Sequence, residues 1–124
     1  MTQRVTATYL IATLQDARAR TLELINDLDQ EQLMGPKLPG VNPLRWEIGH
    51  IAYFYEFFIL RRLYGHDSIL GLKADELYDS IAVAHDTRWD LPLLSMTETL
   101  AYMNDVLEKV CACLLYTSPS PRDM

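Results

Sequence analysis

The sequence predicts an all-α protein, a helical bundle, from three stretches of its 124 residues. Residues 5–29 and 95–110 place apolar side chains at steps of three and four, and residues 43–64 are apolar on almost every face. The chain carries no alternating strand pattern, no internal repeat and no glycine-rich phosphate loop. We therefore expect a bundle of long helices whose final helix or helices are missing.

The first helix is expected over residues 5–29. Its apolar stripe is formed by Leu10, Leu14, Ala17, Thr21, Leu24 and Leu28, and charged side chains occupy the other faces. The turn-forming residues from Gly35 to Gly40 separate this helix from the next one.

The second helix is expected to begin with Asn42 as the N-cap and Pro43 as the first helical residue, and to end at Tyr64 before Gly65. Most of its surface is apolar, so the helix is expected to be buried on several sides. Its aromatic side chains are expected in the core: Trp46, Tyr53, Phe54, Phe57 and Phe58. A solvated edge is expected at Glu56, Arg61 and Arg62.

A short helix is expected over residues 73–84, followed by an extended connection, HDTRWDLPLL. Ser95 and Glu98 then form a capping box, which predicts a third long helix. Its apolar residues are Met96, Leu100, Met103, Leu107 and Val110.

Composition excludes several classes of protein. The net charge of −6, with 11 basic against 17 acidic residues and no basic cluster, argues against a nucleic-acid partner. No apolar run is long enough to span a bilayer, and the first residues lack the apolar segment of a signal peptide. Cys111 and Cys113 are too close in sequence to suit a disulfide. We expect a cytoplasmic protein that binds neither nucleic acid nor membrane.

The last residues, CLLYTSPSPRDM, differ in kind from the rest. Read back into codons, the segment from Cys113 to Asp123 resembles a transposase sequencing adapter. The expected organisation is therefore a helical domain over residues 1–112, followed by a non-native tail over residues 113–124. A natural disordered tail is the alternative.

His50 is the leading candidate for a functional residue. It projects from the aromatic surface of the second helix, one turn from Trp46, Glu47 and Phe54. A packed histidine bonded to a carbonyl or carboxylate, with Glu47 as a possible partner, is the ordinary interpretation of such a residue. The chain has no H-x-x-x-H or H-E-x-x-H pair, so its own residues predict no complete metal site.

The stretches NPLRWEIGHIAYFYEFFILRRL and LYDSIAVAHDTRWDLPL resemble the N-terminal DinB-like domain of the hercynine oxygenase family. These enzymes are the ergothioneine synthases and their selenoneine-forming relatives. The resemblance extends from Ala17 to Tyr102, and its most specific part is W-x-x-G-H-x-A-x-F. It implies a four-helix bundle, incomplete here, and a separate C-terminal domain similar to sulfatase-modifying factor.

The resemblance also implies a chemistry. The family holds Fe(II) through one histidine of the G-H-x-A motif, which His50 matches, and two from an H-x-x-x-H pair on a later helix. The implied reaction joins a thiol, such as cysteine or γ-glutamylcysteine, or a selenium donor to hercynine by oxidative C–S or C–Se bond formation. Neutral imidazoles suit iron(II), and a set of only three protein ligands leaves coordination positions open. The tyrosine that takes part in catalysis belongs to the C-terminal domain in this family and has no counterpart here.

Arg88 is the second candidate. In the family, basic residues at this place, shortly before an L-P pair, help to bind the carboxylates of the thiol substrate, and a guanidinium suits that task. A surface ion pair with Asp86 or Asp90 is the alternative for Arg88. His85 stands where some relatives have a second arginine and is expected to be a loop residue.

Two other classes of function remain open. A different DinB-like enzyme, such as a metal-dependent thiol transferase, shares the bundle and the first histidine but needs no second domain. A helical interaction module without catalysis needs His50 only as a packed residue.

Re-amplification of the genomic locus is expected to replace CLLYTSPSPRDM with a continued amphipathic helix and, further on, an H-x-x-x-H pair. Sequencing across the codon for Ala112 checks this. A stop codon soon after it, or a reading frame that ends without such a pair, would contradict the prediction.

Overall fold

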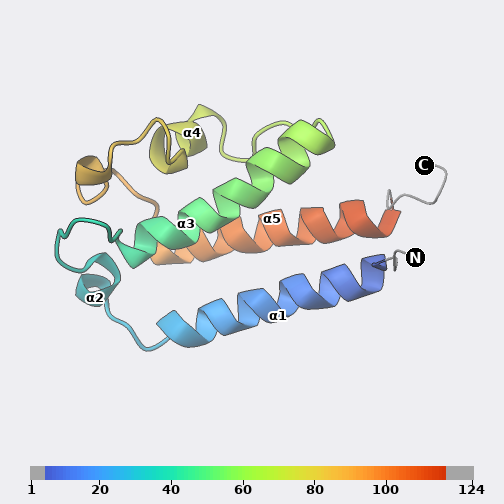
Figure 1. The fold of residues 1–124 in the computed structure, drawn as a ribbon, viewed down its shortest axis with the longest axis horizontal. Helices are drawn as coiled ribbons and strands as arrows, with labels where there is room; N and C mark the ends of the chain where they lie inside the picture. Colours follow the sequence, from blue (N-terminus) through green and yellow to red (C-terminus); the bar gives the residue numbers. More distant parts are fainter. Residues whose placement is uncertain (1–4, 117–124) are drawn as a thin grey trace.

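The computed structural model describes residues 5–116, and every regular element in that range is a helix, which confirms the predicted all-α class. Three long segments run side by side: α1 (Ala7–Ile25), α3 (Leu44–Tyr55) with the π-helix η1 (Glu56–Leu63) that continues it, and α5 (Met96–Tyr116) (Figure 1). Both α1 and α3 pack on α5. Three shorter elements complete the described chain: α2 (Gln30–Met34), α4 (Leu72–Tyr78) and the 3-10 turn η2 (His85–Thr87). None of these helices is long and apolar enough to cross a membrane.

The first helix ends earlier than predicted, at Ile25 instead of residue 29. Asp29 caps the separate helix α2, because its carboxylate accepts the Gln32 N–H at 2.8 Å and the Gln32 side chain accepts the Asp29 N–H at 2.9 Å. This reciprocal capping box satisfies two N–H groups that a continuous helix would have paired internally. The apolar repeat at Leu28 therefore belongs to the connection and not to α1.

The second long helix ends where predicted, with Tyr64 as the C-cap and Gly65 following at φ 72°. Its start is one residue later than predicted, because Pro43 is the N-cap and Leu44 the first helical residue. Asn42 does not cap the helix. Its side chain donates to Glu47 Oε2 at 3.1 Å and accepts from Arg88 at 3.0 Å.

The solvated edge predicted for the second helix is wrong for Glu56, which is fully buried at the start of η1. Its carboxylate accepts the Tyr102 hydroxyl at 2.5 Å and the Ile69 N–H at 2.6 Å. Glu56 lies four residues after the buried Ala52 and four before the buried Leu60, so it shares their buried face. Burial and the bond to Glu56 raise the pKa of the Tyr102 hydroxyl well above its usual value.

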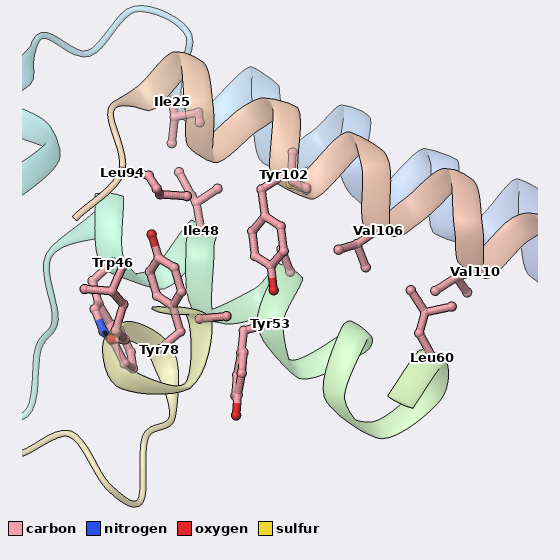
Figure 2. Packing of buried hydrophobic residues seen from close by; sticks show 14 of the residues in the cluster. Ile25, Trp46, Ile48, Tyr53, Leu60, Tyr78, Leu94, Tyr102, Val106 and Val110 are labelled. Atoms are coloured by element: carbon pink, nitrogen blue, oxygen red, sulfur yellow. Dashed lines mark hydrogen bonds between the residues drawn. The ribbon is translucent and has the colours of Figure 1, made fainter. Parts of the chain in front are cut away.

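The aromatic residues of this helix divide between core and surface. Trp46 and Tyr53 are buried as predicted, and Figure 2 shows both within the cluster that Tyr78 and Tyr102 complete. Phe57 is half-buried against the same core. The core prediction is wrong for two residues that pack on each other at the surface, at 4.7 Å between ring centroids and about half exposed: Phe54 and Phe58.

Helix α4 is shorter than the predicted 73–84, since it ends at Tyr78. Asp79 leaves the helical conformation and its carboxylate accepts the Ile81 N–H at 3.0 Å, a local bond that competes with helix continuation. The connection after residue 84 is not fully extended, because it begins with η2. Tyr53 and Arg61 donate to Asp75 at 2.6 and 2.9 Å, which fixes α4 against α3 and η1.

The predicted capping box of α5 is confirmed. The Glu98 N–H donates to Ser95 Oγ and the Ser95 N–H to Glu98 Oε1, both at 3.1 Å. The helix continues to Tyr116, with Cys113 buried, and so crosses the predicted boundary between residues 112 and 113. That boundary stays a prediction, and residues 117–124 of the expected tail lie outside the described residues.

Gly49 allows α3 and α4 to approach closely, and its substitution tests that contact. A Cβ at Gly49 would lie 2.3 Å from Cε1 and Cζ of the fully buried Tyr78 ring. We expect Gly49→Ala to lower the free energy of unfolding by about 1–3 kcal/mol, the usual cost of overpacking, measured by urea denaturation. In a Tyr78→Leu background the same change should cost much less. An equal cost in both backgrounds would contradict the assigned contact.

Candidate functional site

His50 lies in the middle of α3, half-buried, with its ring held between aromatic neighbours. It stacks on Trp46 with 4.6 Å between ring centroids and 10° between ring planes. Phe54 approaches it edge-on at 6.4 Å. Both neighbours are one helical turn away, so the α-helical spacing of the sequence produces this arrangement directly.

A main-chain carbonyl of α4 fixes which nitrogen of His50 carries the proton. Nδ1 of His50 lies 2.8 Å from the Tyr78 carbonyl oxygen. A carbonyl only accepts hydrogen bonds, so Nδ1 carries the proton and the neutral ring keeps the lone pair of Nε2. Metal-binding histidines in proteins commonly have this second bond from the other ring nitrogen. The predicted partner, Glu47, is wrong, because its carboxylate accepts from Asn42 instead.

The end of α4 provides a second acceptor beside the first. The Trp46 indole N–H donates to the Leu77 carbonyl at 2.7 Å. The last carbonyls of a helix have no partner inside the helix, so α3 satisfies two of them with adjacent side chains. The close approach at Gly49 makes this possible, because no Cβ separates α3 from the Tyr78 ring.

Beside His50 the surface is hollowed and apolar. A hollow of about 280 Å³ is lined by His50, Ile51, Phe54 and Tyr55. A groove of about 320 Å³ between α1, α3 and α5 shares Ile51 and Tyr55 with it. The two concavities are therefore neighbours, and the hollow that His50 lines adjoins an apolar groove in the bundle.

The side chains of residues 5–116 do not form a complete metal site. Within that range no three histidine, cysteine, aspartate or glutamate side chains form a group that could hold a metal ion. His66 lies 3.9 Å from Cys113 Sγ, and His85 Nε2 lies 2.6 Å from the Val41 carbonyl oxygen. His85 is in η2, in the connection where it was expected. His50 thus fits a metal as one imidazole ligand, and further ligands are needed to complete a site.

Arg88 is buried, and the alternative of a surface ion pair with Asp86 or Asp90 is wrong. Its guanidinium donates to the Val83 carbonyl from Nη2 and Nε at 2.7 and 3.2 Å, to the Ser80 carbonyl at 3.0 Å and to Asn42 Oδ1 at 3.0 Å. It lies over Trp46, with Cζ 4.1 Å from the ring centroid. These bonds use four of its five N–H groups. A role in binding a substrate carboxylate stays a prediction.

Three contributors to this arrangement were not predicted: the main-chain carbonyls of Leu77 and Tyr78, and the close contact at Gly49. A carbonyl carries no sequence signal, since every residue has one. A glycine in the middle of an apolar helix, directly before the histidine, is a signal that could have indicated a close helix contact.

The fold and this site define an all-helical domain with one metal-competent histidine on its central aromatic helix. The DinB superfamily pattern matches residues 13–121, so the chain belongs to the DinB superfamily. This confirms the predicted DinB-like character of the domain.

Curated relatives carry the name hercynine oxygenase. The chain is 35% identical over 94 residues to the one from Mycobacterium tuberculosis, an alignment that covers 75% of this chain and 22% of that protein. The one from Mycolicibacterium thermoresistibile is 33% identical over 109 residues, which cover 85% and 24% of the two chains. The one from Mycolicibacterium smegmatis is 34% identical over 96 residues, with 75% and 22% covered. The chain thus spans about a quarter of the length of these relatives. The predicted resemblance to the N-terminal part of hercynine oxygenases is confirmed.

The 124-residue chain alone is expected to bind Fe(II) only weakly, because a single imidazole cannot fix the geometry of an iron site. Anaerobic titration with Fe(II), followed by desalting and metal analysis, measures this. Retention of one iron per chain after desalting would contradict the interpretation of His50 as one ligand among several.

Proposed function

We propose that the chain is part of a non-haem iron(II) oxygenase that forms a C–S or C–Se bond between hercynine and a thiol or selenium donor. His50 is the proposed iron ligand from this part of the protein. The observation that carries the proposal is the bond from His50 Nδ1 to the Tyr78 carbonyl, which leaves Nε2 with its lone pair. The relatives named hercynine oxygenase support the choice of reaction.

In the proposed site, the residues of this chain hold and orient the His50 ring. Trp46 and the Tyr78 carbonyl hold the His50 ring in one plane and one tautomer. The proposed ligand atom, Nε2, is therefore already oriented before a metal binds. Ile51, Phe54 and Tyr55 line the hollow beside it and make its wall largely apolar. Iron bound here supplies the redox chemistry that lets dioxygen take part in bond formation.

The remaining two ligands are proposed to come from an H-x-x-x-H pair on a later helix of the full-length protein, beyond the 124 residues of this chain. Histidines four residues apart lie on one face of a helix, so one helix can present both. The groove between α1, α3 and α5 adjoins the histidine hollow, and a helix along that groove would pass His50.

The substrates are proposed to be small molecules: hercynine, a thiol or selenium donor, and oxygen. We propose that the protein acts in the cytoplasm, where low-molecular-weight thiols are kept reduced. The net charge of −6 supports the absence of a nucleic-acid partner.

His50→Ala in the full-length protein tests this function. Iron per chain and the rate of oxygen consumption with hercynine and thiol are expected to fall together by at least about tenfold, because one of three ligands is lost. The helical circular dichroism signal should change little, since His50 is only half-buried.

His85→Ala is the matched control. It also removes an imidazole that is bonded to a main-chain carbonyl, and it should retain iron. If His50→Ala keeps full iron and full rate but loses thermal stability, His50 is a packed residue and the proposed function is wrong.

A further inference from the structure

We propose that Arg88 is a positioning residue of the histidine site, which acts through Trp46 and the chain after α4 and not through contact with a substrate. The inference deepens the proposed function, because it assigns the part of the structure that orients the proposed ligand. It depends on a layered arrangement of three side chains: Arg88 over Trp46, and Trp46 on His50.

The first support for this role is the set of groups that the guanidinium joins. On one side it bonds to the Ser80 and Val83 carbonyls, which belong to the segment directly after α4. On the other side it bonds to Asn42 Oδ1, in the connection directly before α3. Arg88 therefore ties the end of α4 to the beginning of α3, where the two helices flank the histidine.

The second support is the sequence position of the carbonyls involved. The carbonyls of Leu77, Tyr78, Ser80 and Val83 accept, in this order, from Trp46, His50, Arg88 and again Arg88. Four acceptors within seven residues leave this segment little freedom. The Tyr78 carbonyl, which determines the tautomer of His50, lies two residues from the nearest acceptor of Arg88.

The third support is that the guanidinium has little capacity left for another ligand. Arg88 is 8% exposed, and four of its five N–H groups are already used inside the fold. A lysine could keep the charge over Trp46 but could not reproduce the planar fork that bonds to several acceptors at once.

The ring nitrogens of His50 report directly on this role, without iron. In the 15N-labelled 124-residue chain, at a pH at which the imidazole is neutral, long-range 1H–15N spectra distinguish Nδ1–H from Nε2–H. We expect Nδ1–H to predominate in the unsubstituted chain. In Arg88→Lys and Arg88→Gln the ratio of Nδ1–H to Nε2–H should fall by about two- to tenfold, as expected when a hydrogen bond of ordinary strength is weakened.

Two controls isolate the effect. Arg62→Gln removes another arginine that lies over an aromatic ring, that of Phe58, and should leave the His50 tautomer unchanged. The tautomer of His66 should be the same in all variants. A folded Arg88→Lys or Arg88→Gln chain with the unsubstituted tautomer ratio would overturn the proposal. Loss of the helical signal in both variants would also overturn it, because Arg88 would then support the whole fold and not one ring.

The full-length enzyme separates a positioning role from a substrate-binding role. If Arg88 positions His50, Arg88→Lys lowers iron per chain and kcat while KM for the thiol stays unchanged. If Arg88 binds the thiol substrate, KM for the thiol rises and the iron content stays unchanged, which would overturn the proposal. Retention of iron by His50→Ala would instead refute the proposed function, and the tautomer measurement would still decide whether Arg88 orients His50.

Discussion

The contact between α3 and the last turn of α4 determines how His50 is held in this domain. Two α3 side chains donate to consecutive carbonyls at the end of α4, and a third residue, Gly49, has no side chain and lets the helices meet. A helix end needs external donors for its last carbonyls, and an imidazole needs an acceptor to hold one tautomer. The hydrogen bond from His50 Nδ1 to the Tyr78 carbonyl meets both requirements. The bond that satisfies the end of α4 therefore also orients the histidine.

The long helices could be predicted from the sequence because their signals are local. The capping box at Ser95 and Glu98 and the end of the second helix at Gly65 are both present in the structure. The first helix was predicted too long because the local sequence pattern fits two different structures. Leu28 fits the apolar spacing of the first helix but directly precedes the capping box of Asp29, and α1 ends at Ile25.

The candidate site could be predicted only in part. The position of His50 on an aromatic helix follows from spacing, and so does its contact with Trp46. The identity of its hydrogen-bond partner does not, because the Tyr78 carbonyl is 28 residues away and carries no side-chain signal. Glu56 shows the same limit. A charged residue on an apolar helix suggests solvent, but two donors from other parts of the chain, the Tyr102 hydroxyl and the Ile69 N–H, satisfy its carboxylate inside the core.

The burial of Arg88 has a consequence for how this site is organised. A buried cation is tolerated only when its N–H groups are satisfied, and here three main-chain or amide oxygens and an aromatic face supply that environment without a carboxylate. The charged guanidinium thus lies against the Trp46 ring, which also stacks on His50. The indole separates guanidinium from imidazole, so the proposed positioning role of Arg88 needs no hydrogen bond to the histidine. A guanidinium in direct contact with His50 would donate to Nε2 and occupy the lone pair that metal coordination would need. The Trp46 indole between them avoids that competition.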